Sequence, residues 1–198
     1  MSMHKQAQTS APLELVLLLF LGVLWGIPYA LTKISLSAIP PLTLVAARVS
    51  VASITLWIIV FAMGLKLSPR RDLIGRLCLQ GCIGCAVPYT LITLGQQSVH
   101  SALAAILNST GPLFVCLINV AWLRREPVTL GRLAGVTLGL LGVVLIAGTG
   151  ALLNFGDSIV GQSAIILATI SSAIGVVHGR RFATTAPEVA AAGTLTWA

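Results

Sequence analysis

Charged side chains are scarce in this 198-residue chain, and acidic ones are scarcest of all. Asp, Glu, Lys and Arg together make up 9% of the residues, whereas hydrophobic types make up 57%. A soluble domain has about 25% charged and about 45–50% apolar residues, so five acidic and twelve basic side chains are too few to cover a water-soluble globule. Low charge combined with high hydrophobicity also excludes intrinsic disorder. The class that remains is a multi-pass membrane protein.

Long apolar runs follow one another along the chain, and each is about 20 residues long, the length that a helix needs to cross the hydrocarbon. None of them alternates polar and apolar residues as a barrel strand does, and lipid admits only helices or closed barrels. The sequence therefore predicts an all-α bundle of membrane-spanning helices. The runs are Leu15–Leu36, Leu42–Met63, Leu73–Gln97, Ala102–Leu123, Gly131–Gly150 and Ser158–His178.

The net charge of +7 is spread over short gaps between these runs. A basic surface for nucleic acid would gather on one face, so we expect no nucleic-acid partner. Lys33 lies alone in an opposite gap and Arg48 lies within the second run, while the other basic residues share one side. Because basic loops stay in the cytoplasm, the sequence predicts a cell-membrane protein with a cytoplasmic N-terminus. That side holds Lys5, Lys66, Arg70, Arg71, Arg76, Arg124, Arg125, Arg132, Arg180 and Arg181.

Polar side chains from four predicted helices share a depth of about six to eight residues from the outer helix ends. Arg48 is the only charge well inside a run, about 9 Å deep. An intramembrane charge indicates a functional site, although an arginine at this depth can also snorkel to the interface. We predict a solute site in which Arg48 holds an anionic group, Tyr29, Tyr89 and Asn108 orient the solute, and Trp25 forms an apolar wall.

The third run carries small and polar groups along one helical face. Three cysteines on a single helix cannot surround a metal ion, so the sequence predicts packing rather than a metal site. The polar part of the stripe fits either a cavity lining or hydrogen bonds between helices. Prolines inside three runs should kink their helices. The stripe consists of Cys78, Cys82, Cys85, Tyr89, Thr93 and Gln96, and the prolines are Pro28, Pro88 and Pro112.

Signals for catalysis are missing. Gly161–Ala164 resembles the serine motif of intramembrane proteases, but such a serine needs a histidine within hydrogen-bond reach, and His178 lies about 22 Å from Ser163 along the same helix. No phosphate loop and no paired carboxylates occur within a run. We therefore expect no enzyme, no cofactor and no metal.

Two segments resemble each other in a way that suggests an inverted repeat. Trp25–Lys33 and Ser172–Arg180 are both small-residue-rich helix ends that close on a basic residue, and five helices separate them. Other motifs carry a resemblance to the EamA-type members of the drug/metabolite transporter superfamily. These are Leu24-Trp25-Gly26 with Lys33, Pro41 to Arg48, Ser101–Asn108 leading to Gly111–Phe114, and Arg125–Val128 followed by Gly131 and Gly135.

The resemblance implies ten helices in two inverted five-helix repeats that move small metabolites, often outward, by proton coupling or exchange. Residues 13–150 would form the first repeat and 158–198 an incomplete second one. The twelve residues from Pro187 reach only about 18 Å, so we expect a truncated chain ending in a partial helix without a stable partner. Transport would then need a second copy, a separate half or the missing residues; the alternative is a non-transporting membrane protein or scaffold.

Overall fold

A computed structural model describes residues 11–65, 71–119, 130–147 and 158–198. Every regular element within those ranges is a helix. Five helical stretches in the described part are long and apolar enough to cross a membrane. The predicted all-α, multi-pass architecture is thereby confirmed. The basic gaps around Lys66, Arg70, Arg124 and Arg125 lie outside the described residues.

The first two helices correspond closely to the first two apolar runs. Helix α1 (Ala11–Ser35) passes through Pro28 without a break, so this proline ends no helix. Helix α2 (Pro41–Ala62) begins with a proline in its first turn, where the missing N–H would have no partner in any case. It is followed by Gly64, whose φ of 67° lies in the left-handed region that glycine adopts without strain.

The next two runs are interrupted near their prolines, as expected. The third forms one rod of α3 (Arg71–Gly81), the π-helix η1 (Cys82–Ala86) and α4 (Val87–Ser98), with Pro88 just after the π-helical segment. The fourth divides into α5 (Ser101–Asn108) and α6 (Gly111–Ile118), with Pro112 in the first turn of α6.

The remaining helices complete the bundle. They are α7 (Leu130–Ala147), α9 (Ile159–Gly179), the 3₁₀ turn η3 (Arg180–Phe182) and α10 (Pro187–Thr196). Ser158 caps the start of α9, where its hydroxyl accepts the Gly161 N–H at 3.3 Å.

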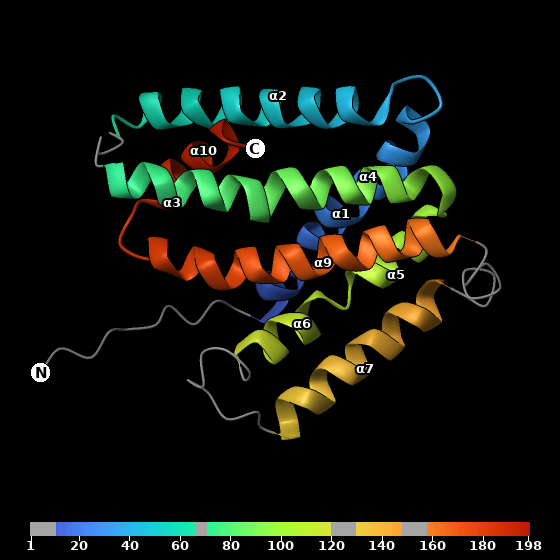
Figure 1. Ribbon diagram of the computed structural model, residues 1–198. Coiled ribbons are helices and arrows are strands. Elements are labelled where there is room, and N and C mark those ends of the chain that lie inside the picture. Colours follow the sequence, from blue (N-terminus) through green and yellow to red (C-terminus); the bar gives the residue numbers. More distant parts are fainter. Residues whose placement is uncertain (1–10, 66–70, 120–129, 148–157) are drawn as a thin grey trace, which may run out of the picture.

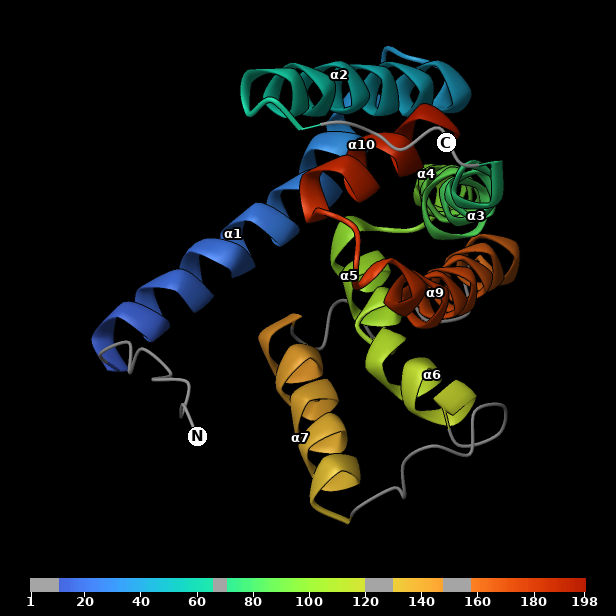
Figure 2. The ribbon, with the colours of Figure 1, turned by 90° about the vertical axis from the view of Figure 1, so that its left-hand side faces the viewer.

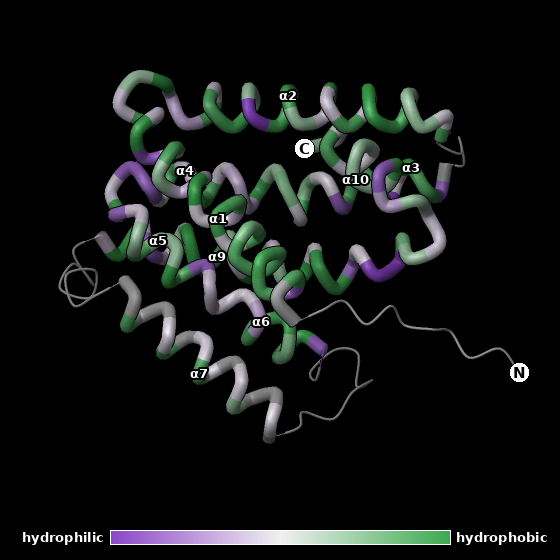
Figure 3. The backbone as a smooth tube through the Cα atoms, turned by 180° about the vertical axis from the view of Figure 1, so that it is seen from behind, coloured by the Kyte–Doolittle hydropathy of each residue, from purple (hydrophilic) through white to green (hydrophobic). Residues whose placement is uncertain are grey.

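Helices α2, α3–α4 and α9 lie one above another along a common direction (Figure 1). Helix α1 runs obliquely behind them, and α7 stands apart on the far side of α5 and α6 (Figure 2). Apolar residues dominate the helices, and polar ones gather mostly near the helix ends (Figure 3). This is the pattern expected of helices whose outer faces meet lipid.

The π-helix η1 and helix α4 both approach α9 through glycines. A Cβ on Gly175 would lie 2.7 Å from the Cα of Gly84, and a Cβ on Gly95 would lie 2.7 Å from the carbonyl oxygen of Gly161. Two helix backbones can come this close only where side chains are missing, which is how small residues support packing in membranes.

Helix α10 lies between α2 and α3 (Figure 1). Its Val189 and Ala192 form a buried cluster with Val60 of α2. The indole N–H of Trp57 donates to the Thr196 hydroxyl at 2.9 Å. The prediction that this segment has no stable partner is therefore wrong. The prediction rested on the short length of this segment. The residues that pack against α10 lie more than a hundred positions earlier in the chain, so the sequence did not reveal them.

Candidate solute-binding site

A groove of about 530 Å³ lies between the α3–η1–α4 rod and the η3–α10 segment. The rod contributes Gln80, Cys85 and Tyr89, and α10 contributes Thr194 among small apolar residues. Solute sites are typically concave and mostly apolar, with a few polar groups that fix orientation. This groove has that composition.

Tyr89 connects the groove to the predicted charge. The guanidinium carbon of Arg48 lies 5.0 Å from the centroid of the Tyr89 ring, within the range of a cation–π interaction. Tyr29 of α1 is close enough to interact electrostatically with both Arg48 and Tyr89. Cys85 lies one helical turn before Tyr89, and both side chains line the groove. Three of the five predicted site residues are thus brought together from α1, α2 and α4.

The other two predicted residues lie elsewhere. The Asn108 side-chain oxygen accepts the Thr169 hydroxyl at 3.2 Å, so this amide lies in the contact of α5 with α9. Trp25 is 71% exposed on α1 and does not line the groove. Residues at the same depth in the membrane can still point to different sides of their helices, so the shared depth did not predict which side chains meet.

The π-helical segment leaves one backbone carbonyl, that of Ile83, without a donor in its own helix. In its register the Val87 N–H bonds to the Cys82 carbonyl, so the next N–H would serve Ile83. That position is Pro88, which has no N–H. The Ser171 hydroxyl of α9 donates to the Ile83 carbonyl at 2.7 Å instead, and the backbone group that the proline leaves free is satisfied within the bundle.

Gln80 is a site residue that the sequence did not single out. Its Nε2 donates to the Gly175 carbonyl at 3.1 Å, which turns Oε1 toward Nδ1 of His178 at 2.8 Å. The amide therefore joins α3 to α9 at the edge of the groove. A glutamine near the polar end of an apolar run was a weak signal, because only the packing of α9 gives it partners.

The π-helix also divides the polar stripe. Cys78 and Cys82 are exposed on the bundle surface, Cys85 and Tyr89 line the groove, and Thr93 and Gln96 are buried. The stripe serves both of the roles left open by the sequence, but along different parts of the rod. Within the described residues no three metal-ligating side chains converge.

Comparison with known proteins assigns the sequence to a family. Residues 12–148 match the model of the EamA-like transporter family, which is more than half of the chain. The chain belongs to the EamA-like transporter family.

Several curated relatives support the same assignment. The chain is 29% identical over 163 residues to the uncharacterized inner membrane transporter YedA of Escherichia coli K12, covering 81% of this chain and 51% of the relative. It is 25% identical over 156 residues to an uncharacterized transporter of Archaeoglobus fulgidus, covering 79% of this chain and 53% of the relative. An S-adenosylmethionine/S-adenosylhomocysteine transporter of Chlamydia trachomatis is 28% identical over 127 residues, 64% of this chain and 38% of that protein.

The chain spans about half the length of the first two relatives. No solved structure matches it significantly. The family assignment thus comes from the sequence matches, and the arrangement of helices comes from the structure described above.

Proposed function

We propose that this EamA-family chain takes part in moving a small metabolite or drug-like solute across the cell membrane, and that the groove beside Tyr89 binds the solute. The direction would be outward and the mechanism alternating access, in which a site between two inverted repeats opens to each side in turn. Residues 13–150 and 158–198 would belong to different repeats. The partners would be the solute and the bilayer, with a second copy or a complementing half completing the pathway. We propose transport rather than catalysis.

The observation that carries this proposal is the position of Arg48. Its guanidinium lies against the Tyr89 ring, it is the only charged side chain of α2, and it makes no hydrogen bond or ion pair with another described residue. A charge within a membrane span is costly and is usually retained for function. The planar fork of N–H donors matches a carboxylate or phosphate. An anionic group on the solute would therefore replace the partner that the protein does not provide.

The neighbouring groups suit the rest of such a solute. The ring of Tyr89 offers apolar contact, and the Gln80 amide and Thr194 lie along the same groove. Among the described residues, no acidic side chain lines the groove. This chemistry favours an amphipathic anion or zwitterion over a cation.

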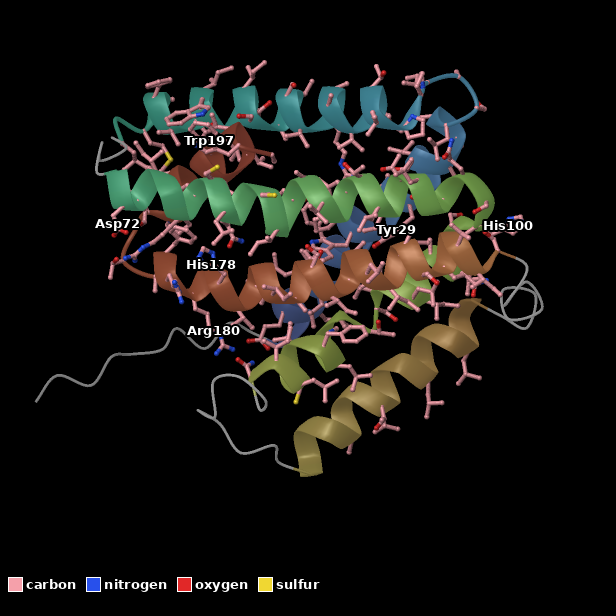
Figure 4. The ribbon with its side chains drawn as sticks, in the orientation of Figure 1. Tyr29, Asp72, His100, His178, Arg180 and Trp197 are labelled. Carbon is pink, nitrogen blue, oxygen red and sulfur yellow. The ribbon has the colours of Figure 1, made fainter. Side chains whose placement is uncertain are left out.

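The groove lies toward the end of the bundle that carries Asp72, His178 and Arg180, opposite His100 (Figure 4). Basic residues collect at that end, which supports a cytoplasmic position for it and for the N-terminus. The groove would then admit solute from the cytoplasm, as export requires.

Solute binding to the purified chain in nanodiscs tests the proposal. S-adenosylmethionine, taken from the name of the chlamydial relative, is the first probe because it carries a carboxylate, and a set of amino acids and aromatic carboxylates follows. Arg48→Ala should weaken binding of the responding probe at least tenfold, the equivalent of about 1.4 kcal/mol, while Arg48→Lys should lose less. Thr55→Val is the control, because this hydroxyl of α2 bonds only to its own helix at the Val51 carbonyl.

Equal binding by the wild type and Arg48→Ala would contradict the assigned site. A chain that binds none of these probes would favour the non-transporting alternative. Protein recovered in detergent is measured in parallel, so that a loss of binding is separated from a loss of folded protein.

A further inference from the structure

Lys33 forms an unusual contact at the end of the bundle away from the groove. Its ammonium donates to the backbone carbonyls of Gln96 at 2.6 Å, Gln97 at 3.3 Å and Val99 at 3.1 Å. These carbonyls end α4 and begin the turn into α5. The last carbonyls of a helix have no partner within it, and a cation near that terminus is also favoured by the helix dipole. One side chain of α1 thus supplies the missing donors of α4.

A second polar contact ties the same two helices together. The Gln96 side chain is fully buried, and its Nε2 donates to the Tyr29 carbonyl of α1 at 3.0 Å. Gln96 Oε1 has no hydrogen-bond partner among the described residues. The α1–α4 contact at this end therefore contains several hydrogen bonds, and these lie beside an apolar cluster that includes Val99 and against which Tyr29 packs.

This contact is linked to the proposed solute site through helix α1. Tyr29 lies one helical turn before Lys33 on α1, and it interacts with Arg48 and Tyr89 beside the groove. A movement of this part of α1 would shift the phenol of Tyr29 together with Lys33. The groove itself is lined by Gln80 and Thr185, which lie toward the opposite end of the bundle.

We propose that Lys33 is a releasable latch, which holds α1 against the α4–α5 turn while the groove is open at the other end. When the ammonium leaves the three carbonyls, α1 separates from α4 at the Lys33 end and the groove closes. The proposal rests on the proposed function, because it names the contact that alternating access must break. The residue would act by positioning α1 and would not touch the solute.

The test uses two cysteine reporters in a background where Cys78, Cys82 and Cys116 are replaced by alanine. Native Cys85 lines the groove, and Val99→Cys, on a residue 2% exposed, reports on the Lys33 end. Each protein carries only one of the two reporter cysteines, so Cys85 is replaced by alanine in the protein that carries Val99→Cys. The rate of modification by a charged methanethiosulfonate is measured on the chain in nanodiscs.

Lys33→Met, which keeps the length of the side chain without its donors, should raise the rate at Val99→Cys at least threefold and lower the rate at Cys85 at least threefold. Lys33→Arg keeps charge and donors and should change neither rate by as much. A rise at Val99→Cys with no change at Cys85 would show only a local helix cap and would overturn the latch. No change at either reporter would overturn it as well.

Lys33→Gln provides a milder variant that keeps one donating group. Rates that rise at both reporters in Lys33→Met and in Lys33→Gln would show that Lys33 supports the fold as a whole, which also contradicts the latch. Neither measurement uses a solute. A failure of the Arg48 binding experiment would therefore leave this result interpretable, and the two proposals can fail separately.

Discussion

Several polar side chains in this bundle donate to the backbone of another helix. Gln80 donates to Gly175, Gln96 to Tyr29 and Ser171 to Ile83, each at the carbonyl oxygen. In the hydrocarbon there is no water to satisfy a freed carbonyl, so a side chain that reaches one from a neighbouring helix both stabilises and orients the pair.

The Ser171 contact gives a prediction for stability. Ser171→Ala removes the donor to the Ile83 carbonyl that Pro88 leaves free, and hydrogen bonds between membrane helices contribute about 0.6 kcal/mol on average and about 1.7 kcal/mol at most. We expect a loss in that range, measured as the free energy of unfolding in SDS titrations. Ser172→Ala, one position further along the same helix, is the control and should change little. Equal effects of the two variants would contradict the assigned role.

Some of the residues that make these contacts could be predicted from the sequence, and others could not. Arg48 and Tyr89 could be predicted, because a charge and a phenol stand out within apolar runs. That a proline frees a carbonyl could be predicted too. Which donor satisfies that carbonyl could not, since Ser171 lies 88 positions away. Gln80 and Lys33 were missed as contacts for the same reason.

Among the elements, η1 and α4 pack closely against α9 through glycines. This packing uses Gly84 with Gly175 and Gly95 with Gly161, and these glycines come from the part matched by the family model and from the part beyond it. The stride of glycines in α7 was as visible in the sequence, but a Cβ on Gly131, Gly135 or Gly139 would meet nothing within 4 Å. Spacing alone does not tell which glycines carry a helix contact.

A pair of glycine substitutions tests this difference. Gly175→Ala places a methyl group 2.7 Å from the Gly84 Cα and should force η1 and α9 apart, with a loss of about 1–3 kcal/mol in the free energy of unfolding. Gly139→Ala meets nothing within 4 Å and should be neutral or slightly stabilising, since alanine favours helix. Thermal unfolding in detergent compares the two. A Gly175→Ala protein as stable as the control would refute the close approach.

Helix positions were largely predictable from the sequence, because each apolar run has the length of a span. The divisions within runs three and four follow Pro88 and Pro112, which were recognised as kink sites. The packing of α10 was not foreseen. Its contacts with α2 and α3 are distant along the chain, and twelve residues considered alone show neither a partner nor a burial pattern.

The whole molecule is a helical membrane protein whose two ends differ in charge. Lys33 faces one end, while Arg76, Arg180 and Arg181 lie at the other together with His178. This asymmetry was visible in the sequence, because loops that carry Lys and Arg alternate with loops that carry almost no charge. The pairing of helices across the bundle was not, since lipid-facing and protein-facing apolar residues look alike in a sequence.

The orientation in the membrane can be measured directly. Ser37→Cys lies in the exposed α1–α2 turn and Thr184→Cys in the exposed turn before α10, at opposite ends of the bundle. With the native cysteines replaced, an impermeant maleimide applied to intact cells should label Ser37→Cys and reach Thr184→Cys only after permeabilisation. The reverse pattern would place the N-terminus outside and contradict the charge argument.

The wide turn at Cys82–Ala86 sets the rotation of everything before it. Tyr89 stands nine positions after Gln80, and in an uninterrupted α-helix, at about 100° per residue, the two would point in nearly opposite directions. The wider turn absorbs about one residue, and both side chains line one groove. Removing a single residue from this segment would leave an uninterrupted α-helix, in which Gln80 and Tyr89 stand eight positions apart and differ by only about 80° in direction. In evolutionary terms, the segment behaves as a one-residue insertion that the wider turn absorbs, so that Gln80 and Tyr89 line the same groove despite the extra residue.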